Sequence, residues 1–350
     1  MLFSTIVRYE KRLALISLLF LPACGGSTSP VGPGPGPTAD PGHPVSGVVF
    51  YDVNANGILD PAETVRLPGV TVAVGGRTGE TTDGGRFTVA GVPAGEQQAE
   101  VQAGSLPAYF RTGAALTVTV PQATGTLEVP ATLEIGRNYP NTYLGFGDSI
   151  TRGEGGGPGG GYLGYLEADL RSYWGEATLE NAGDPGTKSY QGESRLWQTL
   201  QHARPAFTLI LYGTNDWNDS ECRGGFPCYT VNSLRSMVRQ ARDYGSNPIL
   251  GTIPPANPAY EDRDAAARNV WVSDMNELVR AMAEQERVRI AEIHADFVAQ
   301  PSLESLFFDH VHPNDAGYQL MARAWWRAIT SPAAATTSGA GFGFTAPGAP

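Results

Sequence analysis

The chain has 350 residues, enough for two or three domains, and its composition is ordinary for a soluble protein apart from 44 glycines and 27 prolines. A formal net charge of −11 argues against sequence-independent binding of nucleic acid, which needs a cationic face. No nucleic-acid partner is therefore expected.

The N-terminal segment predicts export. Three basic residues precede a nine-residue apolar run at 13–21, which would be about 14 Å long as a helix and too short for a membrane core of about 30 Å. It is expected to be a removed signal peptide, residues 1–23. The run ends in Leu-Pro-Ala-Cys, which resembles a bacterial lipobox with Cys24 as the lipidated residue. The protein is therefore expected to be an extracytoplasmic lipoprotein anchored to a membrane. Because Pro22 is unusual in a lipobox, ordinary signal-peptide cleavage followed by secretion is the alternative.

The next two segments differ sharply in composition. Residues 24–44 are rich in glycine and proline and predict an extended tether. From 45 to 135, short β stretches separated by turns, with no helical period, predict an all-β Ig-like sandwich.

Between residues 139 and 330, apolar strands alternate with helical segments. The expected strands are 142–147, 177–183, 207–213, 248–255 and 288–297, and the expected helices are 162–174, 192–203, 229–245, 261–286 and 314–329. This alternation predicts an α/β domain: a parallel sheet covered by helices on both faces, with functional loops at the carboxyl ends of the strands. Residues 331–350, rich in Ala, Gly, Thr and Pro, are expected to be a disordered tail.

A glycine-rich segment, 143–162, begins within the first of these strands and contains Ser149. A dinucleotide-binding loop would need glycine at Ile150, and a P-loop would need a lysine that the segment lacks. The Gly-x-Ser-x-Gly elbow fails at Thr151. What remains is a strand-to-helix turn that exposes Ser149. The glycines at 155–161 are expected to form either a wall of the substrate cleft or a solvent loop.

A metal-free ester hydrolase needs a nucleophile, a base, a group that orients the base, and donors for the developing oxyanion. Two histidines are candidates for the base, His310 and His312, both just after Asp309. Of the other three, His43 is expected in the tether, His202 at the end of the sheet away from the site, and His294 inside the last strand. A neutral imidazole, whose ordinary pKa is about 6.5, suits proton transfer at neutral pH.

Four short blocks stand in order along the α/β region: Gly-Asp-Ser-Ile at 147–150, Asn-Ala-Gly-Asp at 181–184, Gly-Thr-Asn-Asp at 213–216, and Asp-His-Val-His-Pro at 309–313. Together they resemble the SGNH hydrolases, the GDSL family of lipases and esterases, over residues 139–330. The resemblance implies a three-layer α/β/α, flavodoxin-like fold. It also implies hydrolysis of carboxylic esters through an acyl-enzyme, with no catalytic cofactor.

The same resemblance assigns the roles in the site. Ser149 is the expected nucleophile, His312 the base, favoured over His310, and Asp309 the residue that orients it. The oxyanion donors are expected to be Ser149, Gly183 and Asn215.

The substrate is left open by these motifs. Acetylated polysaccharides suit an exported enzyme with a spacer domain, whereas lysophospholipids, aryl esters and thioesters are the alternatives. A surface-binding protein with a vestigial hydrolase domain is a hypothesis of another class, and the intact Ser, Gly, Asn, Asp and His argue against it. The expected partners are an ester substrate and, through the lipid anchor, a membrane.

A second motif lies in the β region. The stretch DVNANGILDPAE, 52–63, matches the calcium-loop pattern Asp-x-Asn-x-Asn-Gly-x5-Glu. The expected ligands are Asp52, Asn54, Asn56, the Ile58 carbonyl, Asp60 and Glu63. The loop resembles that of B-type repeats in bacterial adhesins, and residues 81–95 resemble carboxypeptidase regulatory-like folds. Because strands flank the loop, calcium is expected to stiffen it rather than to switch it; a solvated loop without metal is the alternative.

The cysteines agree with export. With Cys24 lipidated, Cys222 and Cys228 remain as an even pair outside the reducing cytosol and predict a disulfide. Two free thiols are the alternative. A zinc site is not expected, because no second Cys or His pair lies near them.

Overall fold

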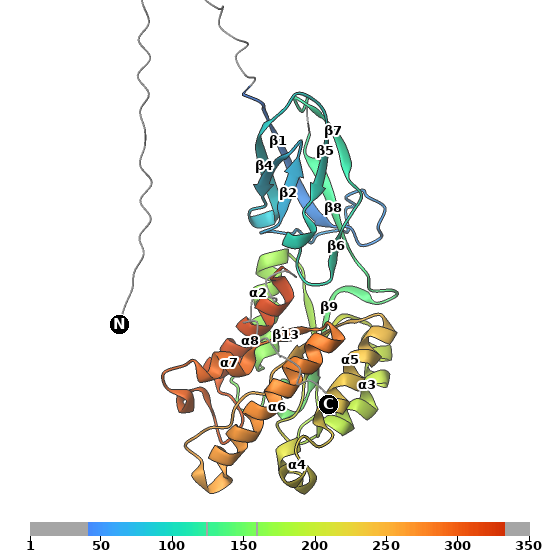
Figure 1. Ribbon diagram of the computed structural model, residues 1–350. Coiled ribbons are helices and arrows are strands. Elements are labelled where there is room, and N and C mark those ends of the chain that lie inside the picture. Colours follow the sequence, from blue (N-terminus) through green and yellow to red (C-terminus); the bar gives the residue numbers. More distant parts are fainter. Residues whose placement is uncertain (1–40, 124, 159, 333–350) are drawn as a thin grey trace, which may run out of the picture. The chain divides into compact units, whose positions relative to one another are not determined.

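The structure, a computed structural model, describes residues 41–123, 125–158 and 160–332 (Figure 1). The predicted signal peptide, Cys24 and most of the tether and of the C-terminal tail lie outside the described residues. Within the described ranges, no helix combines the length and the apolar character needed to cross a membrane.

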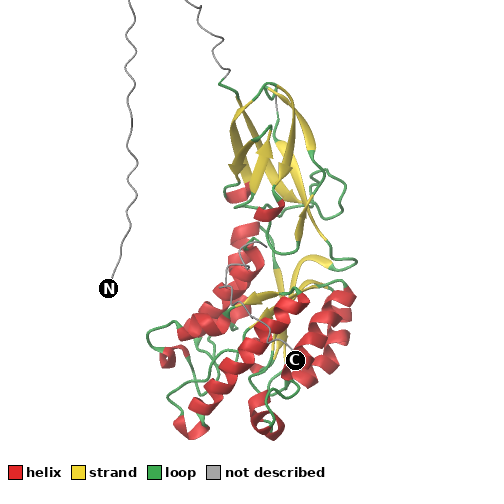
Figure 2. Cartoon of the chain, in the orientation of Figure 1, coloured by secondary structure: helices red, strands yellow, loops and turns green. Residues whose placement is uncertain are grey.

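The chain from 43 to 133 is built of strands (yellow in Figure 2) that form two four-stranded sheets. The bounds are β1 (His43–Tyr51), β2 (Thr71–Val74), β3 (Arg77–Glu80), β4 (Arg86–Val92), β5 (Gly95–Val101), β6 (Phe110–Thr112), β7 (Leu116–Val120) and β8 (Leu127–Leu133). One sheet has the order β4-β1-β8-β6 and the other the order β3-β2-β5-β7.

Side chains in β4 and β7 alternate between buried and exposed, as in strands that place one face on an apolar core. All strand pairs in these sheets are antiparallel except β1 with β8. The all-β character of this region is thus as expected, while its Ig-like classification stays a prediction.

The second region carries a parallel sheet of five strands in the order β10-β9-β11-β12-β13. The bounds are β9 (Tyr139–Gly147), β10 (Thr178–Gly183), β11 (Pro205–Leu211), β12 (Asn247–Gly251) and β13 (Arg289–Ala291). In chain order this is 2-1-3-4-5, the order of flavodoxin-like sheets. All seven residues of β11 are buried, as expected for a central strand covered on both faces.

Two groups of helices cover this sheet (Figures 1 and 2). The helices are α1 (Ser149–Arg152), α2 (Tyr162–Trp174), α3 (Ser189–Ala203), α4 (Ser220–Gly224), α5 (Thr230–Tyr244), α6 (Ala265–Glu286), α7 (Ile293–Val298) and α8 (Asp315–Thr330). Leu209 and Leu211 of β11 join the apolar cluster of α2, α7 and α8, whereas Ile210 between them joins that of α3, α5 and α6. Because successive strand residues point to opposite faces, the sheet lies between the two groups, and the predicted three-layer α/β/α fold is confirmed.

The prediction of one strand over 288–297 is wrong in its second half. Only Arg289–Ala291 forms a strand, and the chain continues as α7. Ile293 and Phe297 are four residues apart and both buried, a helical spacing that the run of apolar residues concealed. His294 therefore lies on a helix, where its backbone N–H donates to Thr252 Oγ1 (2.9 Å) and burial lowers the pKa of its imidazole.

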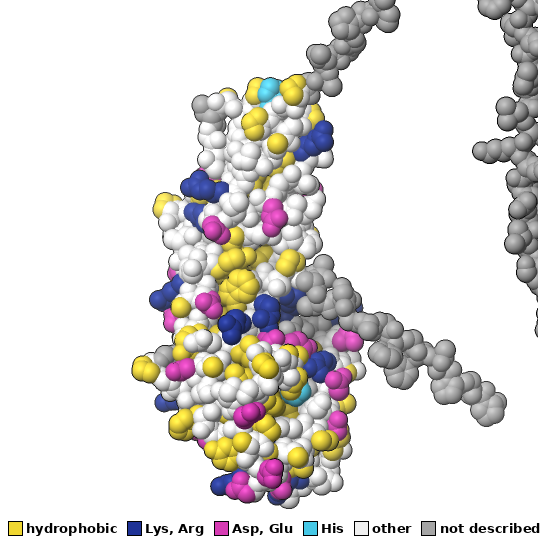
Figure 3. All heavy atoms as spheres, turned by 90° about the vertical axis from the view of Figure 1, so that its left-hand side faces the viewer, with side chains coloured by type: hydrophobic (Ala, Val, Ile, Leu, Met, Phe, Trp, Pro, Cys, Tyr) yellow, Lys and Arg dark blue, Asp and Glu magenta, His cyan; other side chains and the backbone are white. Residues whose placement is uncertain are grey.

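On the face shown in Figure 3, basic and acidic side chains are interspersed among apolar and uncharged ones. The charge of the chain is therefore mixed on this face rather than gathered into a field of one sign.

Candidate active site

Ser149 lies where β9 turns into α1, next to the point where the strand order of the sheet reverses, since β10 and β11 flank β9. Such reversal points are the usual location of sites in open α/β sheets. The turn is tight: a Cβ added to Gly147 would lie 2.1 Å from Thr151 Oγ1 and 2.5 Å from the Leu211 carbonyl. Asp148 caps α1, its Oδ1 accepting the Ile150 N–H (3.0 Å).

The three predicted catalytic side chains meet in one hydrogen-bonded chain. His312 Nε2 lies 2.8 Å from Ser149 Oγ, and His312 Nδ1 lies 2.7 Å from Asp309 Oδ2. The competing candidate, His310, has its Nδ1 3.7 Å from Asp309 Oδ1 and makes no hydrogen bond to Ser149 within the described residues. The geometry therefore favours His312 as the base.

Asp309 is held so that it orients His312. Its Oδ1 accepts the backbone N–H groups of Val311 (2.9 Å) and His312 (2.8 Å). Burial alone would raise the pKa of Asp309, but the hydrogen bonds from the His312 side chain and from these N–H groups outweigh burial and hold the pKa below its ordinary value. The carboxylate is thus ionised at neutral pH. It accepts a hydrogen bond from Nδ1–H, which leaves Nε2 of His312 unprotonated and able to take the Ser149 proton.

The structure changes one of the three expected oxyanion donors. The Gly183 N–H donates to Asn181 Oδ1 (2.9 Å), and a Cβ on Gly183 would lie 2.2 Å from Arg152 N, so this glycine serves close packing against α1. Gly186 lines the pocket instead, with φ +75°, and its N–H has no partner among the described residues. We therefore assign the backbone donor to Gly186 in place of Gly183, because the chain reaches the pocket only after β10 has ended.

The other two donors keep their predicted places. The Ser149 N–H makes no hydrogen bond to any part of the chain that the structure describes. Asn215 follows β11 and lines the same pocket, and its Nδ2 donates to the Thr187 carbonyl (3.1 Å) and to Asp148 Oδ2 (3.3 Å). Because an amide nitrogen has two N–H groups, Nδ2 must release the longer of these hydrogen bonds, the one to Asp148, to donate to an oxyanion. Donors fixed before the reaction stabilise charge that develops in the transition state.

Asp148 is a buried carboxyl beneath these donors. Burial raises the pKa of Asp148 to about 7, the Ile150 N–H opposes part of the rise, and the neighbouring Asp216 adds to it. An unfolded aspartate loses its proton near its ordinary value of 3.8. Between these two values the native state binds more protons than the unfolded state, so the free energy of unfolding falls as pH rises.

We therefore expect Asp148→Asn, which cannot ionise, to weaken the pH dependence of stability. The wild-type free energy of unfolding should fall relative to the variant by up to about 1.4 kcal/mol per pH unit between pH 4 and 7. Denaturation at pH 4.5, 5.5, 6.5 and 7.5 measures this, with the exposed Asp169→Asn as control. Parallel curves for the wild type and Asp148→Asn would show that Asp148 does not titrate in this window.

The glycine-rich segment forms a wall of the site. Glu154 Oε2 lies 3.3 Å from His312 Nε2, and a Cβ on Gly155 would lie 2.8 Å from the Pro313 carbonyl. The Gly157 N–H donates to Asp315 Oδ1 (2.8 Å) at the start of α8. These contacts tie the segment to the loop that carries His312, and they favour the first of the two roles expected for it.

The pocket around Ser149 encloses about 230 Å³. In addition to Ser149, His312 and the donors of Gly186 and Asn215, its lining is formed by Glu154, Asn218, Arg268, His310 and Val311. Glu154 and Arg268 were not expected from the sequence motifs. Val311 is the one hydrocarbon side chain among these residues, so most of the side chains that line the pocket are polar.

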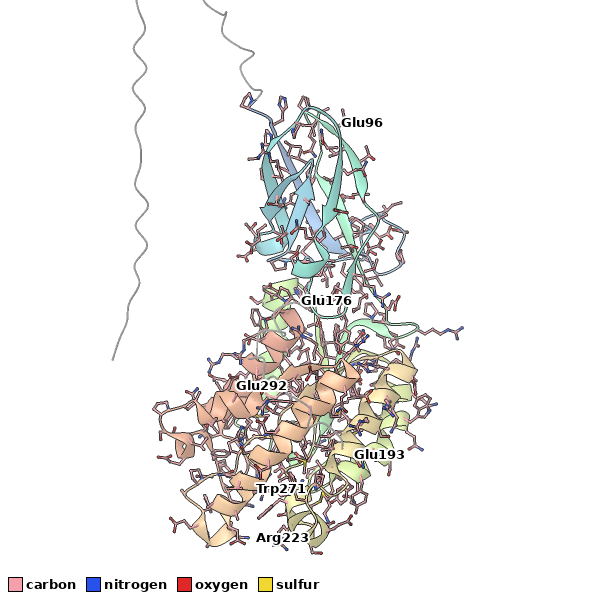
Figure 4. The ribbon with its side chains drawn as sticks, viewed as in Figure 1. Glu96, Glu176, Glu193, Arg223, Trp271 and Glu292 are labelled. Atoms are coloured by element: carbon pink, nitrogen blue, oxygen red, sulfur yellow. A yellow bond between two sulfur atoms is a disulfide. The ribbon has the colours of Figure 1, made fainter. Side chains whose placement is uncertain are left out.

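Cys222 and Cys228 form the predicted disulfide, with their Cα atoms 4.9 Å apart. Cys222, on α4, is buried, and its carbonyl accepts the Trp271 Nε1–H (3.1 Å) from α6 (Trp271 is labelled in Figure 4). The bridge therefore closes a short loop after Asn215 and anchors it on the apolar cluster of α3, α5 and α6.

We expect the double variant Cys222→Ala/Cys228→Ala to lower the free energy of unfolding by about 2 kcal/mol, the chain-entropy contribution of so short a loop. Chemical denaturation of the wild type and the variant measures the change. Alkylation followed by intact-mass measurement is the control. Two thiols that react freely in the unreduced protein would contradict the bridge.

The predicted calcium loop folds around two buried carboxylates. Asp52 Oδ2 accepts the Gly57 N–H (2.7 Å), and Glu63 accepts the N–H groups of Val53 (2.7 Å) and Asp60 (3.0 Å). Asp52 and Glu63 are 2% and 5% exposed, and neither joins an ion pair with another described residue.

The remaining predicted ligands lie on the same loop. The side-chain amides of Asn54 and Asn56 donate to Asp60 Oδ2 at 2.8 and 2.9 Å. Over the described ranges, no three His, Cys, Asp or Glu side chains form a group that could hold a metal ion, so a bound cation would need the Asn oxygens and the Ile58 carbonyl as well. Two buried carboxylates that form no ion pair with another described residue fit a calcium ion in their chemistry.

The model of the GDSL-like Lipase/Acylhydrolase family matches residues 146–320, half of the chain, and includes Ser149 and the Asp309–Pro313 block. No curated protein matches the chain.

Solved structures cover about half of the chain. A lipase/acylhydrolase from Enterococcus faecalis is 21% identical and covers 54% of this chain and 95% of its own, with a TM-score of 0.46. The acetylxylan esterase Axe2 from Geobacillus stearothermophilus is 23% identical and covers 56% of this chain and 97% of its own, with a TM-score of 0.47. LAE5, an alpha/beta hydrolase from the metagenome of Lake Arreo, is 23% identical, covering 55% and 95%, with a TM-score of 0.45.

Proposed function

Because the chain belongs to the GDSL-like lipase/acylhydrolase family and is an ester-hydrolysing enzyme, we propose that it is a serine esterase that removes short acyl groups, foremost acetyl, from polar alcohols such as sugars. The proposed residues are Ser149 as nucleophile, His312 as base and Asp309 as its orienting partner.

The polar lining of the pocket carries this proposal. A long acyl chain gains affinity by burying apolar surface, at roughly 25 cal/mol per Å², and binding sites for such chains are lined mainly by apolar side chains. Here Val311 is the one hydrocarbon side chain in a lining that otherwise offers charged, amide and imidazole groups. Such groups suit a small acyl group and a hydroxyl-rich alcohol.

The geometry supports a two-step reaction. Ser149 Oγ attacks the ester carbonyl carbon while His312 Nε2 takes its proton, and the oxyanion accepts hydrogen bonds from Ser149 N, Gly186 N and Asn215 Nδ2. When the C–O bond breaks, His312 returns the proton to the leaving alcohol. Water then attacks the acyl-enzyme with His312 again as base, and the products are the free acid and restored Ser149.

A panel of esters tests the substrate class. We expect kcat/KM for 4-nitrophenyl acetate to equal or exceed that for the octanoate, because each methylene that finds an apolar wall would add about 0.8 kcal/mol to the binding of the longer chain and this pocket has little such wall. Acetate release from acetyl-xylan should exceed fatty-acid release from lysophosphatidylcholine. The reverse order would favour a lipid acyl hydrolase, and no turnover of any ester would favour a binding protein.

Export is the second part of the proposal. The Cys222–Cys228 bridge supports an oxidising compartment, and the lipobox-like Leu-Pro-Ala-Cys supports a lipid on Cys24. Membrane fractionation of the expressed full chain and its Cys24→Ser variant tests the anchor. An anchored protein moves to the soluble fraction on substitution, whereas a secreted one is soluble in both forms.

We also propose that calcium binds the 52–63 loop and stabilises its fold. Sites of this kind outside the cell bind at about 10⁻⁴–10⁻³ M, so about 5 mM calcium should raise the melting temperature of the full chain. Occupancy at ten times the dissociation constant corresponds to about 1.4 kcal/mol.

Glu63→Ala, which removes the expected bidentate ligand, should abolish the calcium shift, whereas Glu96→Ala on β5 (labelled in Figure 4) should retain it. Calorimetry with calcium and with a chelator measures both variants. Identical wild-type melting curves in the two conditions would mean a solvated loop without metal.

A further inference from the structure

Arg268 is a buried guanidinium that reaches the active-site pocket. It lies in the first turn of α6, is 4% exposed, and lines the pocket together with Ser149 and Asn215. Ala265 and Trp271, three residues before and after it on the helix, are also buried. The helical spacing therefore turns Arg268 toward the interior rather than toward solvent.

This guanidinium has one hydrogen bond and no ion pair with the described residues. Its Nη2 donates to the Thr214 carbonyl. None of the ion pairs in the described part of the chain includes Arg268. Arginine carries five N–H donors. The other nitrogens of the guanidinium keep some accessible surface, because none of them is both buried and unpaired within the described residues. Since Arg268 lines the pocket, these nitrogens are accessible from the pocket.

The charge on Arg268 persists in this position. Burial lowers the pKa of Arg268 to about 10, and the negative charge of Asp148 opposes part of that change. The side chain is therefore cationic at neutral pH. A buried charge without a partner is costly, and a partner that supplies a carboxylate recovers that cost through two parallel hydrogen bonds.

The other charged side chain in the lining lies beside the catalytic base. Glu154 Oε2 is 3.3 Å from His312 Nε2. His310, whose pKa burial lowers, is a neutral donor or acceptor at neutral pH. An anionic group on the substrate is thus repelled from Glu154 and attracted to Arg268.

We propose that Arg268 binds a carboxylate of the substrate, so that the preferred substrates are esters with a carboxylate close to the ester carbonyl. This inference rests on the proposed function and names its substrate class. The carboxylate belongs either to the alcohol, as in an O-acetylated uronic acid, or to the acyl group, as in a half-ester of a dicarboxylic acid. The competing explanation is that Arg268 only positions the Thr214–Asn215 segment.

Matched pairs of substrates separate the two explanations. Acetylated glucuronate is compared with acetylated glucose, and monoethyl glutarate with ethyl pentanoate, by measuring the acid released. In the wild type, kcat/KM should be about 10- to 100-fold higher for the anionic member of at least one pair, the range expected for charge-assisted hydrogen bonds. The pair that shows the preference identifies the part of the ester that carries the carboxylate.

Arg268→Met should reduce this preference to about one, mainly through KM of the anionic ester, and Arg268→Lys should retain part of it. The matched control is Arg263→Met, an exposed arginine just before α6, which should keep the wild-type preference. An equal loss of kcat/KM on both members of a pair in Arg268→Met would overturn the proposal and leave a positioning role.

One measurement does not depend on folding of an arginine variant. Ser149→Ala should bind the anionic ester of at least one of the two pairs with an affinity at least about tenfold above that of its neutral partner, as measured by calorimetry. Equal affinities within both pairs would overturn the proposal. Turnover of neutral esters without any anionic preference would overturn the Arg268 inference alone, whereas absence of all ester turnover would overturn the proposed function.

Discussion

Ser149→Ala and His312→Ala should each lower kcat for acetyl esters by about four to six orders of magnitude, and the double variant should be little slower than either. The reason is geometric. His312 Nε2 lies 2.8 Å from Ser149 Oγ, so the base has no function without the nucleophile, and the nucleophile is weak without the base. Residual turnover should come from binding and from the oxyanion donors.

The neighbouring histidine provides the matched control for this prediction. His310 lies two residues from His312 and lines the same pocket, but its ring does not reach Ser149 in the described structure. His310→Ala should therefore remain at least about 10³-fold more active than His312→Ala. Comparable losses in kcat for the two variants would show that the base is wrongly assigned.

Asn215→Ala should lower kcat by about 10²- to 10³-fold, the second largest effect we expect, with little change in KM. The hydrogen bond to the Thr187 carbonyl (3.1 Å) holds Nδ2 in place, and the N–H that donates to Asp148 Oδ2 over a longer distance (3.3 Å) is the one that must turn to the oxyanion as it forms. An interaction made only in the transition state appears in kcat rather than in KM. Steady-state kinetics on 4-nitrophenyl acetate give both parameters.

Two further variants sharpen this test. Asn215→Asp keeps the size of the side chain but replaces the donor by an acceptor, and it should be at least as impaired as Asn215→Ala. Asn232→Ala, an exposed asparagine on α5, should have wild-type kinetics. A rise in KM with unchanged kcat for Asn215→Ala would contradict an oxyanion role and indicate ground-state binding.

Much of the α/β fold could be predicted because local pattern and final environment agree. The seven buried residues of β11 read as an apolar run, and α2 begins and ends at the predicted residues. The strands of the β region were harder to predict, because β3 has the sequence RTGE with no buried residue and β6 is only three residues long. Such strands are defined by their sheet partners, which the local sequence does not contain.

In the site, the sequence blocks identify the side chains that react and the Ser149 N–H, but not the glycine that supplies the second backbone donor. Ser149, Asp309 and His312 meet as predicted. The choice between Gly183 and Gly186 depends on which backbone N–H donates to the Asn181 side chain. The folded structure shows that it is the Gly183 N–H, and the sequence alone does not. Arg268 could have been noticed in the sequence, because it is an arginine on the apolar face of α6, between Ala265 and Trp271. The sequence pattern does not show, however, that this arginine lines a pocket.

Labelling with a fluorophosphonate tests most directly whether Ser149 is the activated nucleophile of this enzyme. The full-length protein is treated with the probe, digested, and mapped by mass spectrometry, with Ser149→Ala treated in parallel. We predict one adduct, on the peptide that contains Ser149, formed in the wild type and absent from Ser149→Ala. An adduct on another residue, or equal labelling of the two proteins, would contradict the account.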